Sequence, residues 1–179
     1  MIFSPTRIRG AMVVEMEPCE DERGLFARGF CRKEFEAHGL NPDVAQANIG
    51  LSRRRGTLRG LHYQIPPNAE TKLVRCTAGA VFDVIVDLRP ESASYKQWVG
   101  VELTAANRRM LYAPEGCAHG YLALADDTEV FYLVSEFYSP GAERGLRWND
   151  PAFRIEWPIT EDLRISDKDR SWPDWSEPA

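Results

Sequence analysis

Apolar side chains along the chain fall into short runs that are rich in β-branched and aromatic residues and bounded by turn-forming residues. Runs of this kind are typical of β-strands. They predict strands at residues 73–76, 80–88, 98–103, 109–112, 129–138 and 145–148. The run at 80–88 is too densely apolar for a surface strand, so we expect both of its faces to be largely covered.

Helical patterns are few. Residues 32–38 predict a helix that ends at Gly39, because glycine is common just past a helix C-terminus, and a weaker helical pattern covers residues 161–169. The connections between the predicted strands are too short for parallel crossovers and favour antiparallel pairing. The sequence therefore predicts an all-β fold, a β-sandwich or barrel with a few short helices.

No internal repeat, charge block or Gly/Ser linker divides the chain, so we expect one domain over residues 1–179. A barrel of this kind has an interior in which a ligand can bind. Polar side chains inside the strand-like runs are therefore candidates for lining a cavity. These candidates are His62, Lys72, Arg75, Asp83, His119 and Tyr132.

The composition excludes disordered and fibrous proteins, because 44% of the 179 residues are hydrophobic and 27% are charged. A formal net charge of -5 argues against nucleic acid or an anionic membrane as a partner. The N-terminal residues lack the pattern of a signal peptide, and no apolar run reaches the length of a membrane span. We therefore expect a cytoplasmic protein without membrane contact.

The four cysteines are Cys19, Cys31, Cys76 and Cys117. Their spacing contains no C-x-x-C pair, and a chain of this length does not need a disulfide framework. We expect reduced, mostly buried thiols. Cys117 lies close to a histidine, but we expect it to pack in a cavity wall or the core rather than act as a nucleophile.

Two segments place a histidine beside glycines, residues 56–64 with His62 and residues 114–121 with His119. Glycine allows close backbone approach, and imidazole exchanges a proton near neutral pH, so both suit a site for a small ligand. The second segment carries the P-x-G-x-x-H pattern of cupins. The first carries Gln64 where a metal-binding cupin has its second histidine.

A metal-dependent cupin enzyme, such as a dioxygenase or an isomerase, is an alternative. A catalytic transition metal usually has three protein ligands, and His62 and His119 supply only two. Glu70 is a candidate third ligand, although its place after two prolines is more typical of a solvated turn. We therefore expect no metal and no other cofactor.

A longer set of motifs resembles the dTDP-4-dehydrorhamnose 3,5-epimerase family. The motifs are R-G-L-H-Y-Q at 59–64, K-L-V-R at 72–75, V-F-D-V at 81–84, D-L-R at 87–89 and P-E-G-x-A-H-G at 114–120, and the match extends from Asp21 to Asp169. The resemblance implies a cupin-type jelly roll that epimerises C3 and/or C5 of a nucleotide-linked 4-keto-6-deoxy sugar without a metal. It also implies a homodimer in which N-terminal residues of one subunit reach the site of the other.

The chemistry of such a sugar requires a base, a stabiliser for the enolate oxygen and an acid on the opposite face, because the C4 carbonyl acidifies the hydrogens on C3 and C5. By resemblance, His62 is the base, Asp169 orients it as a dyad, and Tyr132 is the acid. Lys72 supplies positive charge near the carbonyl oxygen, with His119 as a hydrogen-bonding neighbour.

The remaining site residues are expected to bind the substrate. Arginine and lysine side chains suit the diphosphate, since they offer positive charge and several donors. The resemblance assigns substrate contacts to Arg23, Phe26, Arg28, Gln46, Asn48, Arg59, Tyr138, Glu143 and Lys168. Tyr138 is expected to share a strand face with Tyr132, because the two lie an even number of residues apart.

The sequence departs from the family pattern in two places. Arg28 stands where the family commonly has a glutamate, and residues 46–52 read Q-A-N-I-G-L-S where the usual pattern is Q-D-N-x-S-x-S. Arginine only donates hydrogen bonds, so it suits guanine or cytosine acceptors better than the N3 hydrogen of thymine. A GDP- or CDP-linked sugar is therefore an alternative substrate, unless Arg28 turns to the diphosphate or to a surface carboxylate.

A non-catalytic module that only binds a sugar nucleotide is the last alternative. It would bind without turnover. Simple binding requires no acid placed opposite a base, so the presence of His62, Asp169 and Tyr132 together favours an enzyme.

Overall fold

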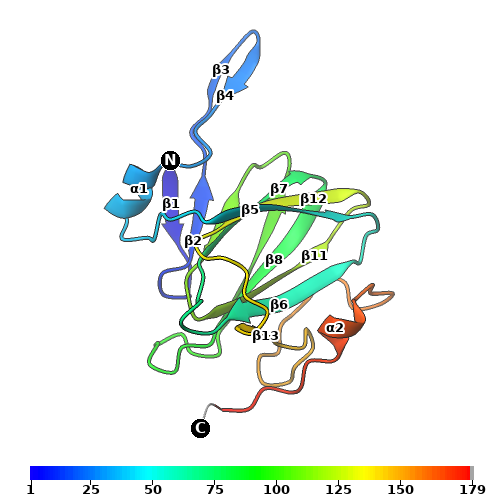
Figure 1. The fold of residues 1–179 in the computed structure, drawn as a ribbon. Coiled ribbons are helices and arrows are strands. Elements are labelled where there is room, and N and C mark those ends of the chain that lie inside the picture. The colour runs from blue at the N-terminus through cyan, green and yellow to red at the C-terminus, as the bar shows by residue number, and fades with distance from the viewer. Residues whose placement is uncertain (178–179) are drawn as a thin grey trace.

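The computed structural model describes residues 1–177, and its body is two antiparallel sheets that face each other (Figure 1). The six-stranded sheet has the order β1 (Ile2–Pro5), β2 (Met12–Glu15), β10 (Met110–Ala113), β7 (Lys72–Ala78), β12 (Thr128–Val134), β5 (Gln46–Ser52). The five-stranded sheet has the order β13 (Glu143–Gly145), β6 (Leu58–Gln64), β11 (Cys117–Ala123), β8 (Ala80–Asp87), β9 (Trp98–Thr104). The predicted all-β architecture with antiparallel pairing is confirmed.

Three small elements lie outside the sandwich. The hairpin of β3 (Cys19–Asp21) and β4 (Gly24–Phe26) projects away from the body, α1 (Arg32–Ala37) lies beside β1, and α2 (Asp167–Arg170) lies beside β6 (Figure 1). Within residues 1–177, no helix has the length and apolar character needed to cross a bilayer.

The strand β8 is covered on both faces, as its dense apolar run predicts. Val81 and Ile85 pack between the two sheets, whereas Val84 and Val86 pack outward against the C-terminal segment, which contributes Phe153 and other apolar side chains. Because both faces of β8 are buried, the five-stranded sheet is the central layer of the molecule. The six-stranded sheet covers one of its faces, and the C-terminal segment covers the other.

Several predicted boundaries are wrong. The strand predicted at 129–138 ends at Val134, the strand predicted at 145–148 is observed at Glu143–Gly145, and the helix predicted at 161–169 is only Asp167–Arg170. The chain before α2 is extended instead, because Arg164 pairs with Thr57 and Leu58 at the start of β6. The helix predicted at 32–38 is confirmed within a residue, and Gly39 follows it with a positive φ of 70°.

The strands β5, β6 and β11 are absent from the predictions, because glycines interrupt their apolar pattern. Two of these glycines allow β6 and β11 to approach closely. A Cβ atom on Gly60 would stand 2.6 Å from the Cα of Gly120, and one on Gly120 would stand 2.7 Å from the Arg59 carbonyl oxygen. Only glycine fits such an approach. The close pairing puts His62 directly opposite His119.

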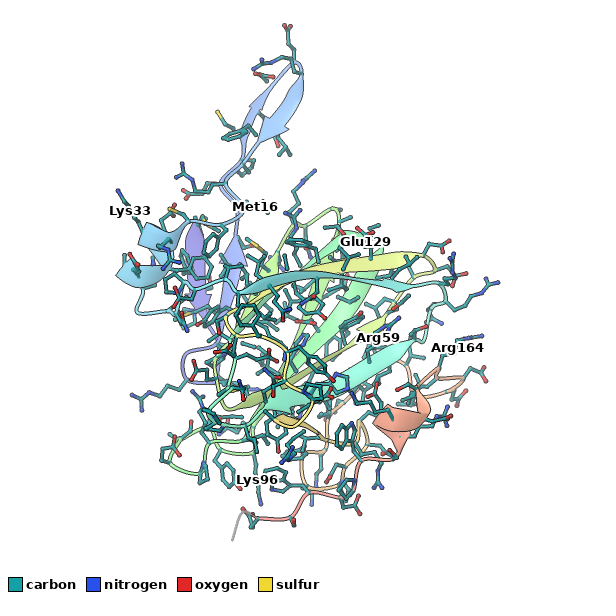
Figure 2. The ribbon with its side chains drawn as sticks, viewed as in Figure 1. Met16, Lys33, Arg59, Lys96, Glu129 and Arg164 are labelled. Carbon is teal, nitrogen blue, oxygen red and sulfur yellow. The ribbon has the colours of Figure 1, made fainter. Side chains whose placement is uncertain are left out.

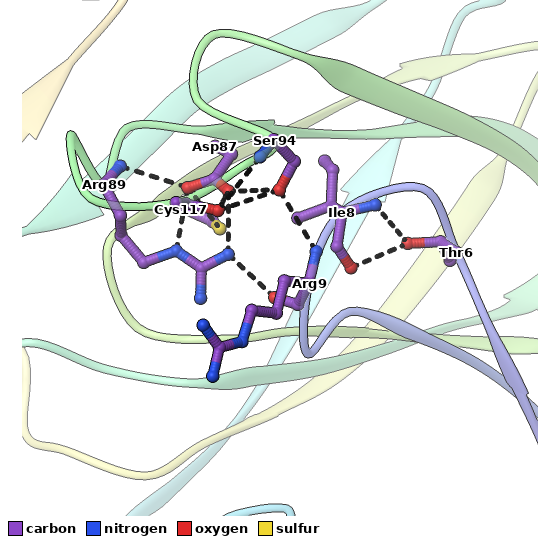
Figure 3. Close-up of polar contacts among 8 residues, drawn as sticks. Thr6, Ile8, Arg9, Asp87, Arg89, Ser94 and Cys117 are labelled. Carbon is purple, nitrogen blue, oxygen red and sulfur yellow. Dashed lines mark hydrogen bonds and ion pairs between the residues drawn. The ribbon is translucent and has the colours of Figure 1, made fainter.

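A buried carboxylate joins the turn after β1 to the loop after β8 (Figure 3). Asp87 is fully buried and accepts hydrogen bonds from Arg89 Nε (2.8 Å), Arg89 Nη2 (2.8 Å) and the hydroxyl of Ser94 (2.6 Å). Arg89 also donates to the carbonyl of Arg9 at 2.7 Å. Burial alone would raise the pKa of Asp87, but these hydrogen bonds outweigh it and lower the pKa to about 2, so the carboxylate stays ionised.

All four cysteine thiols within residues 1–177 are free, but only Cys76 and Cys117 are buried. Cys19 is exposed because the hairpin projects from the body, so the prediction of mostly buried thiols is only half right. Burial raises the pKa of Cys117 to about 12, which keeps the thiol protonated and excludes it as a nucleophile at neutral pH. Cys117 packs in the core between the sheets.

Candidate active site

A cavity of about 1050 Å³ opens between the two sheets and extends to α2. The proposed catalytic residues all line it, whereas Arg23, Phe26 and Arg28 do not. Arg75 and Asp83, two of the polar strand residues expected to line a cavity, do not line it either. Arg59 and Arg164 line the end of the cavity beside α2 (Figure 2). The cavity has the size of a typical small-ligand site, and its polar side chains converge from both sheets.

His62 and Asp169 form the central pair of the cavity. His62 Nε2 lies 2.6 Å from Asp169 Oδ1, and the two residues are 107 positions apart along the chain. The His62 side chain is 32% exposed, whereas the Asp169 side chain is 5% exposed. The pair therefore has one ring open to the cavity and one carboxylate shielded behind it.

Two hydrogen bonds, one to its carboxylate and one from its amide, hold Asp169 in place. The amide of Gly60 donates to Asp169 Oδ2 at 3.2 Å, and the Ser166 side chain caps α2 by accepting from the Asp169 amide at 3.1 Å. Burial alone would raise the pKa of Asp169, but the hydrogen bonds from His62 and Gly60 outweigh it and lower the pKa. An ionised carboxylate only accepts hydrogen bonds, so His62 Nε2 carries a proton and Nδ1 is the nitrogen left to accept one.

Tyr132 enters the cavity from the opposite sheet. It lies on β12, where it pairs with Asn48 of β5 and Val74 of β7. Burial raises the pKa of its hydroxyl, and the nearby Glu70 carboxylate raises it further, so the phenol stays protonated at neutral pH. The cavity thus has an imidazole on one sheet and a protonated phenol on the other.

Lys72 lies on β7 next to β12, and its ammonium group pairs with Glu70. The two side chains are only 10% and 11% exposed. The expectation that Glu70 is a solvated turn residue is therefore wrong: its carboxylate neutralises a buried cation and also accepts from Gln64 Nε2 at 3.3 Å.

His119 is held from behind, as His62 is. Its Nε2 lies 2.8 Å from Oδ1 of Asp83, which is fully buried on β8. Burial raises the pKa of Asp83, although His119 opposes this shift. This carboxyl group fixes the orientation of a second imidazole in the wall of the cavity.

Gln64 binds the loops beside the cavity. Its Nε2 donates to the carbonyls of Asn68 (2.9 Å) and Phe137 (3.2 Å), and its Oε1 accepts from the Ser139 amide at 2.6 Å. Within residues 1–177, no group of three His, Cys, Asp or Glu side chains is arranged to hold a metal ion. Gln64 thus connects the two loops that border the cavity.

The mouth of the cavity carries a second polar group. Lys168 Nζ lies 2.6 Å from both carboxylate oxygens of Glu143, and the Tyr138 hydroxyl donates to Glu143 at 2.9 Å. Tyr138 follows the end of β12, so the prediction that it shares a strand face with Tyr132 is wrong. It borders the cavity from a loop, where Gln46 accepts a hydrogen bond from its amide at 2.8 Å.

Arg23, Phe26 and Arg28 lie away from this cavity. Arg23 is at the tip of the β3–β4 hairpin and pairs with Asp21, while Phe26 is 78% exposed. Arg28 follows the hairpin and approaches Glu34 at 3.5 Å. Within the single chain these three residues form no part of the cavity.

The sequence reasoning missed Tyr121, which lines the cavity beside His119. A signal for it existed, because a residue two positions after a cavity-facing histidine in a strand shares its face. Arg164 and Arg170 also line the cavity, but nothing in their local sequence distinguishes them from surface arginines.

Comparisons with known proteins all indicate the same family. The sequence profile of the dTDP-4-dehydrorhamnose 3,5-epimerase family matches residues 5–177. A protein of Shigella flexneri with that name is 47% identical over 165 residues, which cover 92% of this chain and 90% of the relative.

Solved structures agree with this match. The crystal structure of dTDP-4-dehydrorhamnose 3,5-epimerase from Elizabethkingia anophelis superposes with a TM-score of 0.95 and 38% identity, covering 98% of this chain and 96% of the other. The enzyme of the same name from Bacillus anthracis, solved with TDP and PPi bound, gives a TM-score of 0.92 and 41% identity, covering 97% and 99%.

Proposed function

The chain belongs to the dTDP-4-dehydrorhamnose 3,5-epimerase family, and from this premise we propose which of its side chains carry out the reaction. It is an isomerase with a cupin-like jelly roll, and it epimerises a nucleotide-linked 4-keto-6-deoxy sugar. The names of its relatives favour the thymidine nucleotide over the guanine and cytosine alternatives, and they do not favour a metal-dependent cupin.

His62 is the general base in this proposal. The observation that carries it is the His62–Asp169 pair of 2.6 Å, which faces the cavity opposite Tyr132. Nδ1 of His62 accepts the proton from C3 or C5, and Asp169 stabilises the imidazolium that forms. Tyr132, from the other sheet, then donates a proton to the opposite face of the enolate, which inverts the carbon.

Lys72 stabilises the enolate oxygen that develops at C4. Its ammonium group lines the cavity and is held by Glu70, which offsets its charge but keeps its N–H donors in place before the reaction begins. His119, oriented by Asp83, lies opposite His62 and offers a further hydrogen bond to the sugar.

The diphosphate and the nucleotide occupy the mouth of the cavity. Arg59 and Lys168 supply positive charge there, which suits phosphate oxygens. The other proposed substrate contacts from this subunit are Gln46, Asn48, Tyr138 and Glu143. We include a cytoplasmic location in the proposal, because a nucleotide-sugar substrate forms where nucleotides are available.

The function is tested by incubating the purified protein with a dTDP-linked 4-keto-6-deoxy sugar in deuterated water. We expect deuterium at C3 and C5, unchanged after exhaustive chelation, and weaker turnover of the GDP- and CDP-linked sugars. Absence of label would contradict the epimerase assignment. Loss of activity on chelation, restored by one divalent ion, would instead support a metal-dependent cupin.

We also propose a homodimer in which the β3–β4 hairpin completes the partner's site. Two observations support it. The hairpin projects from the body (Figure 1), and its residues Arg23 and Phe26 are exposed. The outer face of β5 exposes Ile49 and Leu51, of which Ile49 is 67% exposed. An exposed apolar sheet face is typical of a subunit interface. Arg28, at the base of the hairpin, belongs to the same proposed contact.

Mixed dimers test this arrangement. We expect His62→Asn and the hairpin variant Arg23→Ala/Phe26→Ala each to have little activity alone, and coexpression of the two to restore activity. A mixed dimer then has one site with an intact histidine and an intact hairpin from its partner. If the hairpin serves its own subunit, both sites of the mixed dimer are defective and coexpression restores nothing. Sedimentation checks that the dimer forms.

A further inference from the structure

One of the cavity-facing positions on β5 has no side chain, because it is a glycine. Gln46, Asn48 and Gly50 alternate along the strand and all line the cavity. Gln46 and Asn48 offer polar side chains to the substrate, whereas Gly50 offers none. The usual family pattern has a serine at this third position, so this chain lacks a hydroxyl that its relatives commonly have there.

Tyr121 fills the space at Gly50 from the opposite sheet. Its hydroxyl oxygen lies 2.7 Å from the point where a Cβ atom of residue 50 would stand, and its Cζ lies 3.9 Å from that point. Gly50 has no positive φ, so the strand backbone does not itself require glycine. Glycine weakens a strand unless another group approaches closely, and here that group is the phenol of Tyr121.

The position of the Tyr121 hydroxyl is defined by its neighbours. Tyr121 is the direct cross-strand partner of Arg59, and both side chains reach toward β5, where Arg59 donates to the Leu51 carbonyl at 2.9 Å. Tyr132 is near enough to influence the same phenol, and burial raises the pKa of Tyr121 to about 12. The residue proposed for the diphosphate and the residue proposed as the acid thus both lie near the protonated hydroxyl.

We propose that Tyr121 is a substrate-binding residue that donates a hydrogen bond to the sugar-proximal phosphate, and that Gly50 is required to admit its hydroxyl. This inference rests on the proposed function, because the diphosphate end and the sugar end of the cavity are set by the roles of Arg59 and Tyr132. The hydroxyl that the family pattern carries at position 50 of β5 is supplied in this chain by β11. A donor at this point orients the sugar relative to His62 without taking part in proton transfer.

The first test compares the binding of two nucleotides by calorimetry. The diphosphate dTDP carries the sugar-proximal phosphate, whereas dTMP lacks it. We expect Tyr121→Phe to weaken dTDP about tenfold, the effect of losing one hydrogen bond to a charged acceptor, and to leave dTMP unchanged. Tyr63→Phe, which removes a half-buried phenol outside the cavity, is the matched control and should bind both as the wild type does.

The second test is a double-mutant cycle. Gly50→Ser alone puts a Cβ atom against the Tyr121 hydroxyl and should weaken dTDP at least as much as Tyr121→Phe. The combination of both substitutions should bind dTDP better than Gly50→Ser alone, because a phenylalanine ring leaves ordinary contact distance and the serine restores a hydroxyl. Gly141→Ser is the control, since a Cβ atom there meets nothing within 4 Å.

Three results would overturn the inference: unchanged dTDP affinity in Tyr121→Phe, an equal loss for dTMP, or additive effects in the cycle. Thermal unfolding of each variant separates misfolding from lost binding. A wild-type protein that exchanges no substrate protons contradicts the proposed function. If the wild type exchanges substrate protons and Tyr121→Phe binds dTDP normally, only this inference is contradicted.

Discussion

Replacing His62 by asparagine is expected to abolish deuterium exchange at both C3 and C5 while leaving dTDP binding nearly intact. Removal of a general base typically lowers the rate by about 10² to 10⁴. Asparagine is shorter than histidine and its amide does not reach the position of Nε2, so Asp169 loses the donor from the imidazole but keeps the hydrogen bond from the Gly60 amide. Nothing in this substitution removes a group proposed to hold the diphosphate.

The measurement is the rate of label incorporation at each carbon by NMR, together with the dissociation constant for dTDP. His38→Asn is a matched control, because His38 follows α1 on the surface, away from the cavity. Its Nδ1 lies near the Glu34 carbonyl, and its ring stacks on Phe3. Exchange at the wild-type rate in His62→Asn would remove His62 from the role of base. Loss of dTDP binding in the same variant would instead indicate a structural role.

Replacing Tyr132 by phenylalanine is expected to separate proton abstraction from inversion. The ring still packs against the core between the sheets, so the fold is retained, but the hydroxyl that donates to the far face of the enolate is lost. His62 can still remove a proton and return a deuteron from its own side. We therefore expect residual exchange with retained stereochemistry and a loss of inverted product of about 10² or more, a usual cost of removing a general acid.

Product stereochemistry and total label, measured on the same sample, check this expectation, and Tyr63→Phe is again the control. A normal yield of inverted sugar would exclude Tyr132 as the acid. It would direct attention to Tyr138, whose hydroxyl also borders the cavity but is bound to Glu143. A variant that shows neither exchange nor inversion would indicate that Tyr132 is also needed to bind the sugar.

Predictions from local sequence patterns were correct only where the predicted strand or helix continues in the structure. The two-residue repeat keeps side chains on one face only while a strand continues. It fails for Tyr138, because the chain leaves the sheet after Val134 and turns toward Gln64, which binds the Ser139 amide. The predicted helix at 161–169 was shortened for a related reason: pairing of Arg164 with residues at the start of β6 outweighed its helical pattern.

The sequence by itself determined the fold class and the family, and it singled out His62, Lys72, Tyr132 and Asp169 as candidate site residues, because motifs and strand composition are properties of neighbouring residues. Only the tertiary structure decided which of these side chains meet. It brought Asp169 to His62 across 107 positions, placed Tyr132 on the facing sheet, and put Glu70 on Lys72 rather than in solvent. It also placed the Tyr121 hydroxyl at Gly50. Contacts of this kind arise from the packing of two sheets, and no local pattern of residues encodes the distance between atoms on different sheets.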